Sequence, residues 1–401
     1  MIGGGGLMNI LLTMNAHRSV TISLLALTLC TGAQMKDERK GADATQFKTT
    51  DLTGKSAQVD ALLAPWAKDD SPGAAVMVIR DGQVLHSKGY GLANRETREA
   101  FRPDTPSLIG SVTKQFTAMA AMMLAERGKL AYDDPLAKFF PEFPPYARQI
   151  TIRHLLNHTS GLPIFDELTL PEHGVGKETT AKDMLGVLAR QQKLRFAPGA
   201  KFEYNNGGYV LLSHIIEKAS GKDYAQFVQE NIFQPLGMTS SFVSYDETRL
   251  KTTRRAIGYY KEWYGLKVSD FLSPLKLYNG AGSLFSTTED LYKWDQALYT
   301  EKLVKASTLE QAFTRGKLND GADTHYGFGW EIYRYKGVKY VIHPGGWGGF
   351  KAFILRFPEQ RFSVIALSNH GQFDIYNLPL AVTKIYLGGE IAVPDKIVNW
   401  Q

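Results

Sequence analysis

The order of strand-like and helix-like segments restricts the fold of this 401-residue chain more than any other feature of its sequence. Near the N-terminal end, two β-rich runs at residues 74–80 and 83–88 flank Asp81-Gly82, a pair typical of a tight hairpin turn. Apolar spacing in the middle of the chain predicts helices, at residues 111–127, 152–157, 181–190 and 208–219. β-rich runs then return and precede a last helix, with strands predicted at residues 328–336, 338–343, 349–357 and 361–369 and the helix at 375–386.

Strands at both ends of the chain with helices between them predict an α+β fold. We expect an antiparallel sheet that brings the two ends of the chain together, flanked by helices, and a mainly helical lobe at roughly residues 110–300. A cleft is expected between sheet and lobe. The folded domain is predicted to span residues 56–401, because apolar residues recur at helical spacing soon after Ser56. Residues 34–55 are polar and are predicted to form a flexible leader.

Residues 1–33 are predicted to be a signal peptide. Their apolar run, residues 20–29, follows a short basic segment and is too short to span a bilayer as a helix. Thr31 and Ala33 provide the small residues that cleavage requires. The only cysteine, Cys30, offers lipidation as an alternative, but the bulky leucine before it disfavours lipoprotein processing. We therefore expect a periplasmic or secreted protein that reaches the membrane only if Cys30 carries a lipid.

Composition and charge exclude several classes of function. With 44% hydrophobic and 21% charged residues, the chain has the composition of an ordinary folded protein. The formal net charge is +6, but basic and acidic residues are interspersed without a run of lysines or arginines, which argues against nucleic-acid binding. His154 and His158 have i,i+4 spacing, but no third ligand with zinc spacing accompanies them. No metal and no other cofactor is expected.

The first candidate for catalysis is Ser111, three residues before Lys114 at the start of a predicted apolar helix. This i,i+3 spacing places both side chains on one helix face, within reach of each other. Free N–H groups and the positive dipole at a helix start favour a serine alkoxide, and burial of the lysine favours proton exchange with the serine. A lone Ser-x-x-Lys is nevertheless a weak signal, and the sequence contains another at Ser273 and Lys276. The simpler interpretation is a helix-capping serine followed by a solvated lysine.

A second candidate segment contains Tyr204 and Asn206, in a loop just before a predicted helix. A tyrosine held near a lysine can act as a base, and an asparagine can orient both that lysine and a substrate amide. The structural alternative is an aromatic core residue followed by a turn asparagine.

A third segment begins with His343 at the end of an apolar strand and continues to Gly345 and Gly346. The glycines allow a substrate backbone to approach closely. The Gly346 N–H together with the Ser111 N–H would form an oxyanion hole. His343 can bind the tyrosine or a substrate carboxylate, although a strand-end histidine beside a glycine turn is the more common arrangement.

Taken in order, Ser111-x-x-Lys114, Tyr204-x-Asn206 and His343-x-Gly345 resemble the three motifs of serine β-lactamases and penicillin-binding proteins. The resemblance is to the class C-like branch, which includes D-alanyl-D-alanine carboxypeptidases, D-aminopeptidases and esterases. Further segments resemble landmarks of this family, at residues 128–135, 152–163, 235–238 and 282–290.

The resemblance implies a β-lactamase/transpeptidase-like fold, in agreement with the order of elements. It also implies the roles of the site residues. Ser111 would attack a carbonyl to form an acyl-enzyme, Tyr204 and Lys114 would move the proton and later activate water, and Asn206 would hold Lys114 and the substrate amide.

Two departures from the family pattern bear on the substrate. His343 stands where β-lactamases of this branch usually have a lysine, and histidine with a reference pKa of about 6.5 is mostly neutral at pH 7. Pro344 replaces the usual threonine and removes a hydroxyl that would bind a substrate carboxylate. Both changes favour an ester or peptide substrate that lacks a strictly required carboxylate, over efficient β-lactam hydrolysis.

The predicted function is therefore that of an exported serine hydrolase acting on a small-molecule or peptide substrate: an ester, a D-amino acid peptide or a β-lactam. The alternative is a non-catalytic or slowly acylating penicillin-binding or sensor protein with the same fold. An α/β-hydrolase is disfavoured because the sequence contains no Gly-x-Ser-x-Gly.

Overall fold

The computed structural model describes residues 49–164, 181–262, 265–268 and 278–397. The predicted signal peptide, Cys30 and the predicted leader up to residue 48 lie outside the described residues. Helix α1, Thr49–Leu63, begins earlier than the fold start predicted near Ser56, so the last part of the predicted leader is helical rather than flexible. The reason is tertiary packing: Val59 and Leu63 are fully buried, and a helix anchored in this way extends beyond its buried residues.

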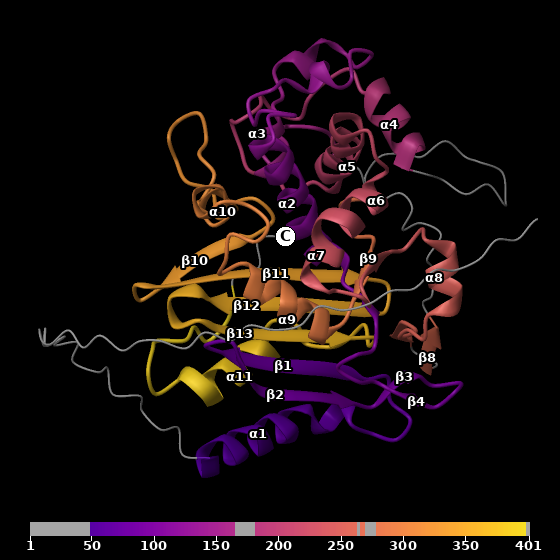
Figure 1. Ribbon diagram of the computed structural model, residues 1–401, viewed down its shortest axis with the longest axis vertical. Coiled ribbons are helices and arrows are strands. Elements are labelled where there is room, and N and C mark those ends of the chain that lie inside the picture. The colour runs from indigo at the N-terminus through magenta and orange to yellow at the C-terminus, as the bar shows by residue number, and fades with distance from the viewer. Residues whose placement is uncertain (1–48, 165–180, 263–264, 269–277, 398–401) are drawn as a thin grey trace, which may run out of the picture. The chain divides into compact units, whose positions relative to one another are not determined.

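The main sheet has the strand order β10-β11-β12-β13-β1-β2, and every neighbouring pair is antiparallel. Its N-terminal strand β1 pairs with the C-terminal strand β13, so that the two ends of the chain meet in the middle of the sheet (Figure 1). The predicted antiparallel α+β architecture is confirmed. The strands are β1 (Ala74–Arg80), β2 (Gln83–Tyr90), β10 (Glu331–Tyr335), β11 (Val338–Trp347), β12 (Phe350–Phe357) and β13 (Phe362–Ser368).

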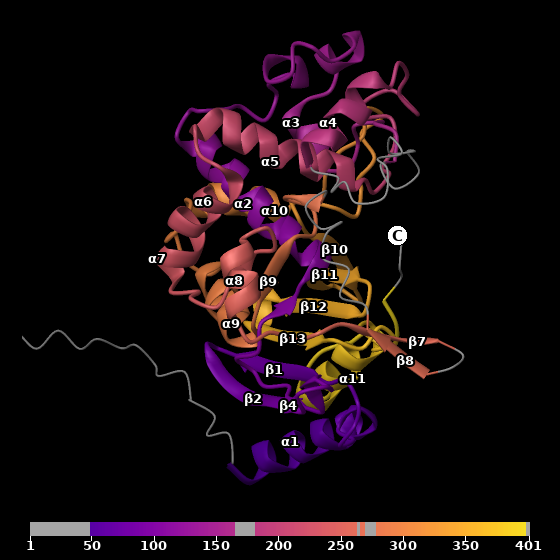
Figure 2. The same ribbon diagram turned by 90° about the vertical axis from the view of Figure 1, so that its right-hand side faces the viewer.

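Both faces of this sheet are buried, which explains why β1 reads as a continuous apolar run instead of an alternating one. Ala75, Met77 and Ile79 belong to one hydrophobic core, whereas the residues between them belong to a second core with α1 and α11 (Asn377–Leu387). Figure 2 shows α9 (Thr288–Ala297) on one side of the sheet and α11 on the other. Since α9 packs on β1 and β13, the chain returns to the sheet before the predicted end of the helical lobe near residue 300.

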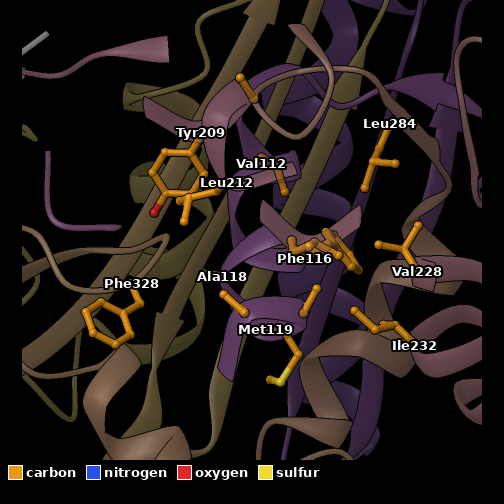
Figure 3. Packing of buried hydrophobic residues seen from close by; sticks show 14 of the residues in the cluster. Val112, Phe116, Ala118, Met119, Tyr209, Leu212, Val228, Ile232, Leu284 and Phe328 are labelled. Atoms are coloured by element: carbon orange, nitrogen blue, oxygen red, sulfur yellow. The ribbon is translucent and has the colours of Figure 1, made fainter. Parts of the chain in front are cut away.

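Helix α2, Thr113–Glu126, runs through the centre of the core that joins sheet and lobe. Every residue from Thr113 to Leu124 is buried, as expected of a helix with partners on all sides. Figure 3 shows Phe116 and Met119 packed close to Ile232. The other helices are α3 (Ile152–Leu156), α4 (Ala181–Arg190), α5 (Asn206–Ser220), α6 (Tyr224–Val228), α7 (Gln234–Leu236), α8 (Glu247–Thr252) and α10 (Ala306–Ala312).

Short strands complete the architecture and were not predicted from the sequence. One small sheet has the order β5-β9-β6, and two hairpins pair β3 with β4 and β7 with β8. Their bounds are β3 (Leu92–Asn94), β4 (Glu99–Ala100), β5 (Ser107–Leu108), β6 (Phe242–Val243), β7 (Tyr259–Glu262), β8 (Gly265–Val268) and β9 (Leu284–Ser286). Among the described residues, no helix has the length and apolar character needed to cross a membrane.

Strand β11 differs most from its prediction. The sequence suggested a break at residues 344–348, but β11 continues through Pro344 to Trp347 and pairs with β12 along its whole length. On the other side, β10 pairs only with residues 338–342, so the second half of β11 has no partner strand there among the described elements. Proline, which lacks an N–H, is tolerated at such an open edge. The open edge borders the candidate site.

Candidate active site

Ser111 lies in a tight 3₁₀ turn, Gly110–Val112, that leads directly into α2. Gly110 has a φ of +51°, a left-handed conformation that glycine adopts without strain. The first hydrogen bonds of the turn are donated by Val112 and Thr113. The Ser111 N–H belongs to the N–H groups at a helix start that the helix itself does not use. The predicted position of Ser111 at the start of a buried helix is confirmed.

Two glycines allow β11 to approach this turn. A Cβ on Gly345 would lie 2.0 Å from the Ile109 carbonyl oxygen and 3.2 Å from the Ser111 nitrogen, and a Cβ on Gly110 would lie 2.7 Å from the Gly346 nitrogen. Any larger residue at either position would push strand and turn apart. The backbone nitrogens of Ser111 and Gly346 are therefore brought close to the same turn, as an oxyanion hole would require.

Lys114 is fully buried directly behind Ser111. Its Nζ donates hydrogen bonds to three acceptors: Ser111 Oγ at 3.0 Å, Asn206 Oδ1 at 2.8 Å and the Ala281 carbonyl oxygen at 2.8 Å. Buried amines require such partners, because an unpaired charge in the interior is costly. The predicted contact of Lys114 with both Ser111 and Asn206 is present.

Tyr204 and Asn206 are held by the residue between them. The side chain of Asn205 caps α5 by accepting the Gly207 N–H at 2.9 Å, and its backbone N–H donates to His158 Nδ1 at 3.1 Å. The helix therefore begins at Asn206, slightly earlier than the predicted residue 208. Asparagine is among the preferred N-cap residues, which explains the position of the loop.

The Tyr204 hydroxyl lies close enough to the Ser111 side chain for the serine to affect its pKa, but the geometry falls short of a hydrogen bond. Burial raises the pKa of Tyr204 well above its ordinary value, and the neighbouring Ser111 side chain lowers it by less. The hydroxyl makes no hydrogen bond of acceptable distance and angle with any described residue. The Lys114 ammonium lies 4.8 Å from the centre of the Tyr204 ring. At neutral pH the resting side chain is a neutral phenol, not a phenolate.

His343 is fully buried, and both ring nitrogens are occupied inside the protein. Nδ1 lies 2.7 Å from the Pro344 carbonyl oxygen and must donate to it, so Nε2 accepts from the Tyr326 hydroxyl at 2.8 Å. Burial and the nearby Lys114 charge lower the pKa of His343 to about 3. The contacts predicted for His343 with a substrate carboxylate or with Tyr204 are therefore not available to it. His343 lies on the same face of β11 as Val341, and that face packs against the core that contains α2.

The two histidines with i,i+4 spacing lie in structural positions. His154 Nδ1 accepts the Thr151 N–H and completes a capping box at the start of α3. His158 packs its ring 4.3 Å from that of Tyr204, and burial together with the Lys114 charge lowers its pKa well below the usual value. In the described ranges, no group of histidine, cysteine, aspartate and glutamate side chains is arranged to hold a metal ion. The second Ser-x-x-Lys, Ser273 and Lys276, lies outside the described residues.

Ser111 opens into two adjoining pockets. The larger, of about 660 Å³, extends from Ser111, Tyr204 and Asn206 past the open edge of β11 to Lys351 and Tyr376. The smaller, of about 320 Å³, is bounded by Gly282, Tyr278 and Trp347, whose two rings lie 4.8 Å apart. Gly345 and Gly346 line the larger pocket, whereas His343 does not.

Several groups at the site were missed by the sequence analysis. The Ala281 carbonyl is a backbone group, for which no residue pattern exists. Tyr326 and Lys351 stand in segments whose residue types suggest only core and strand. The alternation of β12 does place Lys351 opposite Gly346, so an alignment of the two strands is the signal that identifies it.

The chain is similar in sequence and fold to several known proteins. The model of the Beta-lactamase family matches residues 59–379. Penicillin-binding protein 4* of Bacillus subtilis is 34% identical over 80% of this chain and 74% of its own length. The octameric penicillin-binding protein homologue from Pyrococcus abyssi superposes with a TM-score of 0.73 at 31% identity, over 83% of this chain and 77% of that one. A D-amino acid amidase from Ochrobactrum anthropi does so with a TM-score of 0.68 at 26% identity, over 84% and 96%. The chain therefore belongs to the Beta-lactamase family.

Proposed function

We propose that the protein is an exported serine hydrolase that cleaves an amide or ester bond through an acyl-enzyme on Ser111. The observation that carries this proposal is the convergence of Ser111 Oγ, the buried Lys114 amine and the Tyr204 hydroxyl beside the N–H groups of Ser111 and Gly346. These groups come from distant segments of the chain. An arrangement of nucleophile, proton acceptor and oxyanion donors supports acyl transfer.

The three bonds of Lys114 suit proton exchange with Ser111. Asn206 Oδ1 and the Ala281 carbonyl each accept one N–H, and both can do so whether the amine carries two protons or three. The third hydrogen-bonding direction of the Lys114 amine points to Ser111 Oγ, and it holds a proton in the ammonium and a lone pair in the neutral amine. The neutral form of Lys114, which donates only to Asn206 and Ala281, accepts the serine proton as Oγ attacks the substrate carbonyl. The resulting ammonium, which donates to all three acceptors, returns that proton when Oγ leaves.

Tyr204 serves the leaving group in this proposal. As a neutral phenol it donates its proton to the departing nitrogen or oxygen, and the phenolate that forms is stabilised by the adjacent Lys114 ammonium. In deacylation the phenolate takes a proton from water while the remaining hydroxide attacks the acyl carbon. Each proton is thus returned, and the net reaction is addition of one water.

Esters, D-amino acid amides or D-amino acid peptides are the proposed substrates, in preference to β-lactams. The D-amino acid amidase among the structural neighbours supports this choice. Pro344 offers no hydroxyl to a substrate carboxylate, and His343 is neutral and buried. We place the protein in the periplasm or outside the cell, on the basis of the N-terminal sequence alone.

The proposal is tested by covalent labelling of the purified protein with an alkyl fluorophosphonate and with a fluorescent penicillin. The wild type should be labelled, and Ser111→Ala should not. Ser273→Ala is the matched control, because Ser273 also precedes a lysine by three residues, and this variant should be labelled like the wild type.

Turnover distinguishes an enzyme from a sensor that acylates and stalls. An enzyme hydrolyses p-nitrophenyl esters or D-amino acid amides at a steady rate, whereas a stalled protein gives one burst per molecule. Equal labelling of the wild type and Ser111→Ala would contradict the assignment of the nucleophile.

A further inference from the structure

Lys351 is the unexplained charged group of the larger pocket. It lies on β12 directly opposite Gly346 of β11, so its side chain projects from the same face of the sheet as the Gly346 position. Its Nζ lies 3.4 Å from the position that a Cβ on Gly346 would occupy. The ammonium is therefore adjacent to the residue whose N–H contributes to the oxyanion hole.

No described residue neutralises Lys351. No hydrogen bond or ion pair joins its ammonium to another described side chain, whereas the buried Lys114 uses all three of its N–H groups. Lys351 is partly buried and lines the pocket together with Ser111. A cation that faces a substrate pocket without a protein partner is available to an anionic ligand.

Among the described residues that line the same pocket, the only carboxylate, Asp374, is already engaged. Asp374 Oδ1 accepts the Asn377 N–H at 3.0 Å and the Tyr376 N–H at 3.3 Å, and Oδ2 accepts the Asn377 side-chain amide at 2.8 Å. These bonds place Asp374 at the start of α11, where the helix dipole favours a negative charge. Asp374 thus has a structural role, and Lys351 is left as the charge that can select a substrate.

We infer that Lys351 binds a carboxylate on the leaving group of the substrate and so determines specificity. This inference rests on the proposed acyl transfer at Ser111 and deepens it. Tyr204, the proposed proton donor to the leaving group, lines the same pocket as Lys351, so the leaving group lies on this side. The smaller pocket, with Tyr278 and Trp347, then receives the acyl group. The substrate class is an ester or amide with an apolar acyl group and an anionic leaving group.

A matched pair of substrates tests this role: the 3-carboxyphenyl and 3-carbamoylphenyl esters of phenylacetic acid. The two leaving groups have nearly the same shape and differ by one charge. Lys351→Gln should lower kcat/KM for the carboxylate ester about ten-fold, as for the loss of one charge-assisted hydrogen bond, and leave the neutral ester within about two-fold. Lys351→Arg should keep the preference, and Lys351→Glu should reverse it.

Two further measurements separate specific binding from a general effect of charge. Lys129→Gln removes an exposed lysine that does not line the pocket and should leave the ratio of the two kcat/KM values unchanged. Added salt should reduce the wild-type preference for the carboxylate ester. An identical ratio in the wild type and Lys351→Gln would overturn the role of Lys351 alone. Failure of the wild type to hydrolyse either ester in a Ser111-dependent way would overturn the proposed function itself.

Discussion

At the scale of single residues, two buried side chains of the site differ in their hydrogen bonds. Lys114 has an acceptor for each N–H group, whereas the Tyr204 hydroxyl has no hydrogen-bond partner among the described residues. Lys114 is fully buried and donates to Ser111, Asn206 and Ala281. The Tyr204 hydroxyl is also buried but lacks a hydrogen bond among the described residues. Leaving a buried hydroxyl unsatisfied costs about 1–3 kcal/mol of folding free energy. Such a cost is expected where a group must be free to bind a reacting atom.

Tyr204→Phe should therefore separate activity from stability. We expect kcat for ester hydrolysis to fall about 10²–10⁴-fold, because the proton donor is lost. The free energy of unfolding, measured by urea denaturation, should stay constant or rise by up to about 1–3 kcal/mol, because the unsatisfied hydroxyl is removed.

Tyr146→Phe is the matched control for this substitution. The Tyr146 hydroxyl donates to the Leu188 carbonyl oxygen at 2.9 Å, and neither residue lines the larger pocket. Its removal should cost about 1 kcal/mol of stability and leave kcat intact. A stability loss in Tyr204→Phe as large as that in Tyr146→Phe would contradict the description of the Tyr204 hydroxyl as unpartnered.

At the scale of elements, the proposed catalysis depends on how closely strand β11 approaches the turn that carries Ser111. Gly345 and Gly110 have no room for a Cβ, since the nearest backbone atoms would lie at 2.0 Å and 2.7 Å. The second half of β11 is open because β10 pairs only with residues 338–342. Strand and turn thus form one wall of the pocket while leaving the strand edge accessible.

Gly345→Ala should force β11 away from the Ser111 turn and separate the two oxyanion donors. We expect kcat/KM to fall by at least about 10²-fold and the protein to lose about 1–3 kcal/mol of stability through strain. Gly346→Ala is the control, because its Cβ would lie 3.4 Å from the flexible end of Lys351 and at an ordinary contact distance of 3.7 Å from the Phe350 carbonyl oxygen. That variant should unfold at the wild-type urea midpoint, and equal destabilisation of both would argue against steric contact with Ile109 as the cause.

At the scale of the whole molecule, several histidines are folded into places where they remain neutral. Burial, with the Lys114 charge, lowers the pKa of His343 to about 3, and burial with Arg315 lowers that of His325 to about 4. The ordinary value in an unfolded chain is about 6.5. Between about pH 6.5 and pH 4 the unfolded chain therefore binds protons that the folded chain does not, and stability must fall as the pH falls.

His325→Gln should weaken this dependence. Urea denaturation at pH 7.5, 6.5, 5.5 and 4.5 should give a free energy of unfolding that decreases toward acid in the wild type. The decrease should be less steep in His325→Gln, by at most about 1.4 kcal/mol per pH unit for one group. If the free energy of unfolding depended on pH equally in the wild type and in His325→Gln, His325 would have the same pKa in the folded and the unfolded chain, and the prediction would be wrong.

Much of this molecule could be predicted from local pattern. The order of strands and helices gave the antiparallel sheet, and the spacing of Ser111 and Lys114 and the loop with Tyr204 and Asn206 identified groups that the fold brings together. The rest depends on tertiary placement. Whether His343 faces substrate or core is decided by the face of β11 on which it falls, and the Ala281 carbonyl has no residue type that marks it.

The same limit applies to the ends of elements. The residue pattern predicted that the strand ends at residue 343, because proline and glycine usually interrupt a strand. An open strand edge tolerates both residues, and β11 therefore continues. Helix α1 begins at Thr49 because its later turns are anchored in the core. The position of Lys351 beside Gly346 follows from the register of β11 and β12, which local sequence patterns do not reveal.

The pairing of β1 with β13 also affects how the polypeptide reaches its folded state. Ala74 lies opposite Ser368, so the centre of the sheet joins residues from nearly opposite ends of the chain. Contacts of such large sequence separation form slowly, because the entropy of closing the loop must be overcome first. During synthesis the sheet remains incomplete until the last strands have left the ribosome. Under the export proposed above, slow closure of this pairing would keep the chain unfolded while it passes through a translocation channel.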